Sequence, residues 1–153
     1  MREHADRASW QAIRIRHQNL RRFIGASRGI RVVDQYEKNL EELFLLRNPR
    51  YRFDKNYGAA FRAFLRTQSR GRSLDHAGNW FYFPWLNTLV HVFPEPMHQE
   101  LRTGRNQYLI TKQEQAKYYG SVIGVLGMSV GSHAALTIAM TGGKVNKIFR
   151  VTN

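Results

Sequence analysis

The last third of the chain shows the clearest alternation of apolar and polar stretches. An apolar run at 121–126 leads into a glycine turn at 127–131. A second apolar stretch then stops at Gly142–Gly143, and a further β-like run follows at 147–152. Short apolar runs bounded by glycine are typical of buried strands, and the stretch between them is long enough for a helix. The pattern predicts a β-α-β unit with its helix at 130–140.

In the first 70 residues the apolar side chains recur mainly at helical spacing. They predict three helices: over 5–25, from Tyr36 to a stop at Pro49, and over 57–66. The first helix also carries arginines between its apolar positions, a pattern found in helices that bind nucleic acid or a membrane surface. We favour a docking helix whose apolar stripe faces the core and whose arginines face water.

Two β-like runs, at 30–34 and 89–93, lie among these helices, and the segment 80–94 is the aromatic centre of the front half. Aromatic residues beside basic ones can stack on single-stranded nucleic acid. Here they are contiguous, which favours a core position. We interpret His91, within an apolar run, as a buried histidine with satisfied hydrogen bonds. The Asp75–His76 pair lies in a polar loop, and we interpret it as incidental.

The middle of the chain links these two parts. Residues 95–106 predict a short helix and turn, and Thr111 and Glu114 have the spacing of a capping box that begins the next helix. We expect a basic, mainly helical region with an aromatic strand segment over 1–106, and the start of a Rossmann-like nucleotide-binding domain over 107–153. The predicted fold class is α/β: an N-terminal α+β region, then the first β-α-β unit of a parallel sheet, cut off early in its second strand.

The charge is strongly positive and unevenly distributed. The formal net charge is +13, and residues 1–70 hold 16 Lys and Arg against 7 Asp and Glu, whereas residues 71–153 hold 8 against 4. Such an excess attracts polyanions, including nucleic acid, although it is also compatible with a solvated face. There is no cysteine, so a disulfide framework, a cysteine zinc site and a thiol nucleophile are excluded for these residues.

A membrane-spanning helix is an alternative for residues 121–140, which carry no formal charge. Their length meets the requirement for a span, and Gly127 and Gly131 have the spacing of a helix-dimer motif in membranes. The serines, the histidine and the clustered glycines favour a strand, turn and helix instead. No secretory signal is visible at the N-terminus. We therefore expect a cytoplasmic protein without a membrane partner.

The turn at Gly127–Gly131 is compatible with nucleotide binding. A strand, a glycine-rich turn and a helix N-terminus together form a phosphate-binding site in dinucleotide folds. The match to the G-x-G-x-x-G fingerprint is imperfect, because the spacing is one residue short and Ser129 takes the place of the middle glycine. Asn153 falls where an acidic residue would bind the ribose hydroxyls, and it brings no charge.

The same residues also match the G-x-S-x-G elbow of a serine hydrolase. In that fold the acidic residue and the histidine of the triad follow the serine, and only His133 follows Ser129 here. His133 is four residues along the same helix, so the chain contains no triad as it stands. A hydrolase fragment, and a basic binding module whose β-α-β unit is only a scaffold, remain alternatives.

A family resemblance decides between these interpretations. It is carried by the segments Trp80–Trp85, Leu89–Glu95, Leu101–Asn106, Ile110–Gln115 and Ile123–Gly131. With these segments the chain resembles the ThiF/MoeB/HesA superfamily, which is similar to the adenylating domain of ubiquitin-activating enzymes. In particular it resembles the bacterial branch with an N-terminal extension and a nitroreductase-like C-terminal region. The resemblance covers roughly residues 30–153.

The resemblance implies an ATP-dependent adenylyltransferase that activates a carboxylate, such as the C-terminus of a small carrier protein, as an acyl adenylate. It implies that Gly127, Ser129, Gly131 and Ser132 face the phosphates of Mg-ATP and that Asn153 lies at the ribose. Arg105 would reach the nucleotide of a partner subunit in a homodimer. The family's catalytic residues come after the second strand, so we expect the chain to be an N-terminal fragment that is inactive alone. Nucleic acid is a less favoured partner.

Overall fold

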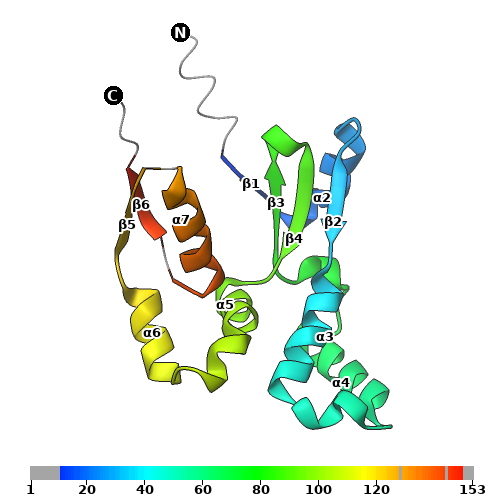
Figure 1. Ribbon diagram of the computed structural model, residues 1–153. Coiled ribbons are helices and arrows are strands. Elements are labelled where there is room, and N and C mark those ends of the chain that lie inside the picture. The colour runs from blue at the N-terminus through cyan, green and yellow to red at the C-terminus, as the bar shows by residue number, and fades with distance from the viewer. Residues whose placement is uncertain (1–10, 128, 144, 150–153) are drawn as a thin grey trace. The chain divides into compact units, whose positions relative to one another are not determined.

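The structure is a computed structural model that describes residues 11–127, 129–143 and 145–149. The chain is a mixed α/β protein, as its hydrophobic pattern predicts (Figure 1). It divides into two compact units, residues 1–98 and residues 99–153. The domain boundary predicted from the sequence lies at 106/107 instead.

The first unit is built on a four-stranded mixed sheet with the order β1-β3-β4-β2 (Figure 1). The pairs β1–β3 and β3–β4 are antiparallel, and β2–β4 is parallel. Pro84 lies immediately after β3, where it removes no ladder hydrogen bond from this central strand. The strands are β1 (Ile13–Ile15), β2 (Arg31–Asp34), β3 (Asn79–Phe83) and β4 (Thr88–Val92).

Helix α2 (His17–Ala26) covers the sheet through one apolar stripe. Its Leu20 is buried with Trp80 of β3 and Leu89 of β4. Partly buried side chains of the same helix and of β1 pack around this cluster, among them Phe23 and Ile15. These contacts form one hydrophobic cluster of the first unit on the α2 side of the sheet.

The predicted helix over 5–25 is wrong in its first described part. Residues 13–15 form β1, whose Ile13 is paired with Tyr82 and whose Ile15 is paired with Trp80. The helix begins only at His17. The isoleucines alternate along the chain, and alternation suits a strand once a partner strand is present. Residues 5–10 lie outside the described part of the chain.

Two helices form the other part of this unit, and both match the predicted pattern. Helix α3 (Tyr36–Arg47) buries Leu40, Leu43 and Phe44, and a 3-10 turn, η1 (Pro49–Phe53), follows at the proline. Helix α4 (Tyr57–Ser69) packs on α3 through aromatic rings. The Phe44 ring lies 5.7 Å from that of Phe61 and 5.4 Å from that of Phe64, so this phenylalanine contributes to the packing of the helix pair.

The β3–β4 turn is closed by the 3-10 turn η3 (Pro84–Leu86) and by Asn87, which has a left-handed backbone (φ 44°). The Asn87 side chain accepts a hydrogen bond from the Tyr82 hydroxyl at 3.0 Å and donates one to the Gly29 carbonyl at 3.1 Å. Its own carbonyl accepts the Arg31 N–H at 2.9 Å. The tip of the hairpin therefore holds the start of β2.

The second unit consists of helices followed by a β-α-β step. Helix α5 (Glu95–Thr103) crosses the boundary between the two units. It is followed by a 3-10 turn, η4 (Gly104–Tyr108), and by helix α6 (Lys112–Gly120), which begins with the predicted capping box of Thr111 and Glu114. Strands β5 (Ile123–Leu126) and β6 (Val145–Phe149) are parallel and are joined by helix α7 (Val130–Met140).

The β-α-β prediction is confirmed, with shifted strand ends. Helix α7 has the predicted bounds, whereas β6 begins two residues before the predicted start, and residues 150–152 lie outside the described part. Val125 is buried, but Ile123 is half-buried and Gly124 is exposed, so the strand is buried only in part. The continuous membrane helix over 121–140 is wrong. No helix in the described ranges combines the length and apolar character needed to cross a bilayer.

Candidate functional site

The turn between β5 and α7 places a glycine with a left-handed backbone between a strand and a helix N-terminus. Gly127 follows the parallel strand β5 with φ +75°, a conformation that a side chain would strain. Ser129 then occupies the N-cap of α7, and Gly131 lies in its first turn. The turn after the strand therefore leads to the N-terminus of an 11-residue helix, which is the positive end of the helix dipole.

The N-terminus of α7 has no cap from a side chain. The Ser129 side chain makes no capping hydrogen bond, and the first turn contains no acidic residue. The Ser132 hydroxyl donates to the Ser129 carbonyl at 2.6 Å, which ties the first turn together without covering its amide groups. Uncapped amide groups at a helix N-terminus favour an anion.

The serine-elbow alternative finds no triad in the described part of the chain. The His133 ring is 3.5 Å from the Ser132 hydroxyl through Nδ1, and it is Ser132, not Ser129, that this ring faces. Ser129 and His133 are both exposed. A nucleophilic serine needs a base within hydrogen-bond reach that is oriented by a third group. The described contacts supply neither to Ser129.

The structure fixes the opposite end of α7 through a polar cluster. Thr141, just after α7, presents its carbonyl to the side-chain amides of Asn106 at 2.9 Å and Gln115 at 3.3 Å. Gly142 packs so closely on Thr103 and Gln99 that a Cβ there would collide with them. These contacts explain the glycine pair after the helix. The pair ends α7, and Gly142 also allows the backbone to lie close to the side chains of Thr103 and Gln99.

Arg105 is exposed on η4, next to Asn106. Because Asn106 binds the C-terminal end of α7, Arg105 belongs to the end of the unit opposite the glycine turn, about 16 Å away along an 11-residue helix. The described hydrogen bonds do not join Arg105 to Gly127, Ser129, Gly131 or Ser132. Asn153 lies outside the described residues. Within those residues, no group of His, Cys, Asp and Glu is arranged to hold a metal ion.

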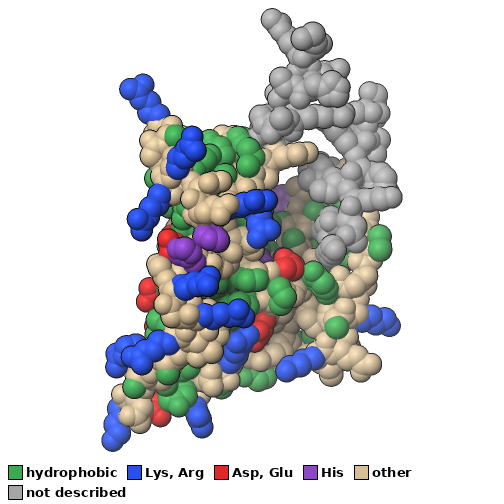
Figure 2. All heavy atoms as spheres, turned by 180° about the vertical axis from the view of Figure 1, so that it is seen from behind, with side chains coloured by type: hydrophobic (Ala, Val, Ile, Leu, Met, Phe, Trp, Pro, Cys, Tyr) green, Lys and Arg blue, Asp and Glu red, His purple; other side chains and the backbone are tan. Residues whose placement is uncertain are grey.

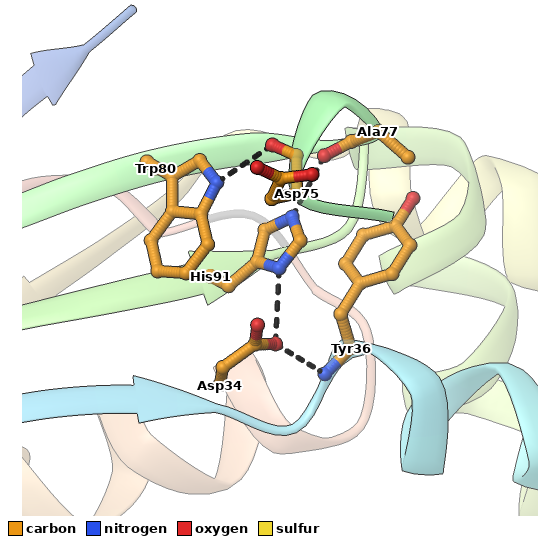
Figure 3. Close-up of polar contacts among 6 residues, drawn as sticks. All are labelled: Asp34, Tyr36, Asp75, Ala77, Trp80 and His91. Atoms are coloured by element: carbon orange, nitrogen blue, oxygen red, sulfur yellow. Dashed lines mark hydrogen bonds and ion pairs between the residues drawn. The ribbon is translucent and has the colours of Figure 1, made fainter. Parts of the chain in front are cut away.

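A second polar cluster, in the first unit, surrounds His91. The residue is 2% exposed, and the ring lies between two aromatic rings, with Tyr36 at 4.2 Å and Trp80 at 4.1 Å, both nearly parallel to it (Figure 3). Its Nε2 is 2.7 Å from the Ala77 carbonyl, and its Nδ1 is 3.0 Å from Asp34 Oδ1. The prediction of a buried, satisfied histidine is confirmed.

Both nitrogens of this ring have a polar partner. A carbonyl only accepts, so Nε2 donates to Ala77. Asp34 Oδ1, which lies 3.0 Å from Nδ1, also accepts the Tyr36 N–H at 3.0 Å. The histidine is closed to solvent, and its role is to join β2, β4 and the segment before β3.

The same cluster orders the segment that contains Asp75. The Trp80 indole N–H donates to the Asp75 carbonyl at 3.0 Å (Figure 3). The sequence gives no signal for this arrangement, because Asp34, Asp75 and His91 come from three separate segments. Burial also raises the pKa of the Tyr36 hydroxyl, as expected for a ring packed against His91 and Phe93.

Comparison with known proteins finds one related segment. No family model and no solved structure matches the chain. Over 69 residues the chain is 35% identical to the uncharacterized protein MT1398 of Mycobacterium tuberculosis (strain CDC 1551 / Oshkosh). The match covers 45% of this chain and 10% of that protein, so the chain spans about a tenth of its relative's length. The similarity shows that the two proteins share a segment, and it gives no information about an activity.

Proposed function

We propose that the chain is the N-terminal part of a ThiF-like adenylyltransferase, which activates a carboxylate with ATP in the cytoplasm. The observation that carries the proposal is the parallel β5–α7–β6 step, with Gly127 at φ +75° between the strand and an uncapped helix N-terminus. This order of elements is that of nucleotide-binding turns in parallel α/β folds. The proposed reaction, adenylation of a carboxylate, comes from the resemblance of the sequence to the ThiF/MoeB/HesA superfamily.

In this proposal the amide groups at 129–132 bind the phosphates of Mg-ATP. The free hydroxyl of Ser129 adds a donor where the usual fingerprint has a glycine, and Ser132 holds the turn in shape through the Ser129 carbonyl. Asn153 would contact the ribose. Arg105, at the far end of α7, suits a role in a partner subunit's site in a homodimer. The carboxylate substrate belongs to a small molecule or to a small carrier protein.

The test is ATP–pyrophosphate exchange by the complete gene product in the presence of candidate carboxylates. Gly127→Asp places a carboxylate at the phosphate-facing turn and is expected to abolish exchange. Gly29→Asp is a matched control, because Gly29 also has a positive φ (65°) and open space where a Cβ would stand. Equal loss of exchange in both variants, or no exchange with any carboxylate, would contradict the proposal.

A second experiment separates the hydrolase alternative. A fluorophosphonate probe labels an activated serine, and labelling that disappears in Ser129→Ala would identify a hydrolase. We expect no labelling, because no base faces Ser129. In an adenylyltransferase the same variant retains exchange and raises the KM for ATP, since it loses one phosphate donor and no catalytic group.

A further inference from the structure

The first unit contains a cleft of about 600 Å³ that the proposed function does not use. One wall is the segment 14–18, where β1 passes into α2. The other wall comes from Asp75 and from residues 78–80 at the start of β3. The volume lies within the ~300–1,000 Å³ range of small-molecule pockets.

The wall at 14–18 is cationic and has unused donors. Arg14, Arg16 and His17 are exposed, and neither arginine forms an ion pair with any described carboxylate. The N-terminus of α2 lies at this wall. Its N-cap residue, Arg16, makes no side-chain capping hydrogen bond, and the first turn of the helix contains no acidic residue. The His17 ring lies 4.7 Å from that of His76. Figure 2 shows many Lys and Arg side chains on this unit, with two histidines side by side among them.

The facing wall offers acceptors. Asp75 lines this wall of the cleft and is partly exposed. A hydrogen bond from Ser73 lowers the pKa of Asp75, with smaller contributions from the charges of His76 and Arg21, so the carboxylate is ionised at neutral pH. Asn79 adds a side-chain amide to the same wall.

We propose that this cleft binds a small phosphorylated molecule that also carries a hydroxyl or amino group. The guanidinium groups of Arg14 and Arg16, with His17, take the phosphate, because their planar forks match its oxygens. Asp75 accepts from the hydroxyl or amino group across the cleft. A continuous polyanion fits less well, because the Asp75 carboxylate would repel it.

The site is independent of the proposed function, because the glycine turn belongs to the other compact unit. The experiment is isothermal titration calorimetry of the folded chain with ribose 5-phosphate, which carries both groups, and with inorganic phosphate. We expect 1:1 binding of ribose 5-phosphate. The double variant Arg14→Ala/Arg16→Ala should weaken it at least tenfold, because a hydrogen bond to a charged group contributes about that much affinity.

The variant Asp75→Asn distinguishes the contribution of Asp75 to binding from that of the arginines on the opposite wall. It should weaken binding of ribose 5-phosphate relative to inorganic phosphate, since it removes the charge that holds the hydroxyl. The matched control is Arg62→Ala/Arg66→Ala on α4, which removes the same charge from another exposed surface of the unit and should leave binding unchanged. Gly127→Asp should also leave it unchanged.

Several outcomes would overturn the proposal. One is no binding of ribose 5-phosphate up to about 10 mM, which corresponds to a negligible affinity. Another is equal weakening in the α4 double variant, which would show a general charge effect. A third is tight binding of a DNA oligomer, sensitive to Arg14 and Arg16, without any binding of ribose 5-phosphate. Circular dichroism of each variant checks that the chain is folded.

Discussion

His91 Nδ1 lies 3.0 Å from Asp34 Oδ1, although the two residues are 57 positions apart in the chain. They are direct partners in the parallel β2–β4 ladder, at the end where β2 passes towards α3. The pair therefore adds a side-chain cross-strand contact to the backbone hydrogen bonds of an edge strand that is only four residues long.

The first prediction concerns Asp34. Asp34→Ala removes the acceptor for both the His91 ring and the Tyr36 N–H, and leaves a buried N–H group without a partner. We expect it to lower the free energy of unfolding by about 2 kcal/mol in urea titrations. Asp34→Asn keeps an acceptor oxygen and should cost less. Asp54→Ala is the control, because Asp54 accepts only the exposed Asn56 N–H. Equal losses at 34 and 54 would contradict the assigned role.

The second prediction compares two glycines with positive φ. A Cβ at Gly78 (φ +66°) would collide with the Tyr36 ring and the Val92 carbonyl, whereas a Cβ at Gly71 (φ +73°) meets nothing within 4 Å. Both alanine variants carry backbone strain of about 1 kcal/mol. Gly78→Ala also overpacks the His91 cluster and should lose about 3 kcal/mol in total. Thermal melts of the two variants measure the difference, and similar melting temperatures would refute it.

The third prediction concerns alkaline pH. Burial, together with the hydrogen bond to Glu41 and its charge, raises the pKa of Tyr57 to about 12. Because this pKa lies above the unfolded value of about 10, the contribution of Tyr57 to stability is complete below about pH 10 and is lost as the pH rises towards 12. Tyr57→Phe should therefore flatten the fall in stability over this range.

Denaturant titrations from about pH 9 to about pH 12 provide the measurement. Tyr51→Phe is the control, because the Tyr51 ring also packs on Phe44, at 5.4 Å. If both variants follow the wild-type pH dependence, the Tyr57–Glu41 contact does not hold the proton in the folded chain.

The fourth prediction concerns the capping box of α6. Thr111 Oγ1 accepts the Glu114 N–H at 3.2 Å, and a Glu114 oxygen accepts the Thr111 N–H at 2.7 Å. Thr111→Ala should cost about 1 kcal/mol, the usual effect of losing an N-cap side chain. Thr67→Ala inside α4 removes a hydroxyl bonded only to the Ala63 carbonyl and should be neutral or slightly stabilising. Urea titrations of both variants test the contrast.

Local signals predicted much of this fold. The bounds of α7 and the capping box at Thr111 follow from glycines and cap residues that act within a few positions, and Pro49 marks the end of α3 for the same reason. The glycine turn was also visible in the sequence, because its geometry depends on residues next to each other.

Long-range pairing explains what the sequence could not predict. Ile13 and Ile15 satisfy both a helical stripe and a strand, and only pairing with Tyr82 and Trp80 decides for the strand. The His91 cluster and the cleft likewise join segments that are distant in the chain. The sequence pattern predicts that the arginines of the 5–25 segment face water on a helix, whereas Arg14 and Arg16 line one wall of the cleft where β1 passes into α2.

The hydrogen bonds of Asn87 bear on the order in which the first sheet assembles. The β3–β4 hairpin closes within a few residues and can form in about 1–10 μs, whereas β2 must be brought to β4 across more than fifty residues. Once the hairpin sets Asn87 in its left-handed conformation, the residue presents an amide donor and a carbonyl acceptor to Gly29 and Arg31. We therefore expect the hairpin to form first and β2 to dock on it, in which case a change at Asn87 slows folding more than it speeds unfolding, as stopped-flow refolding and unfolding rates would show.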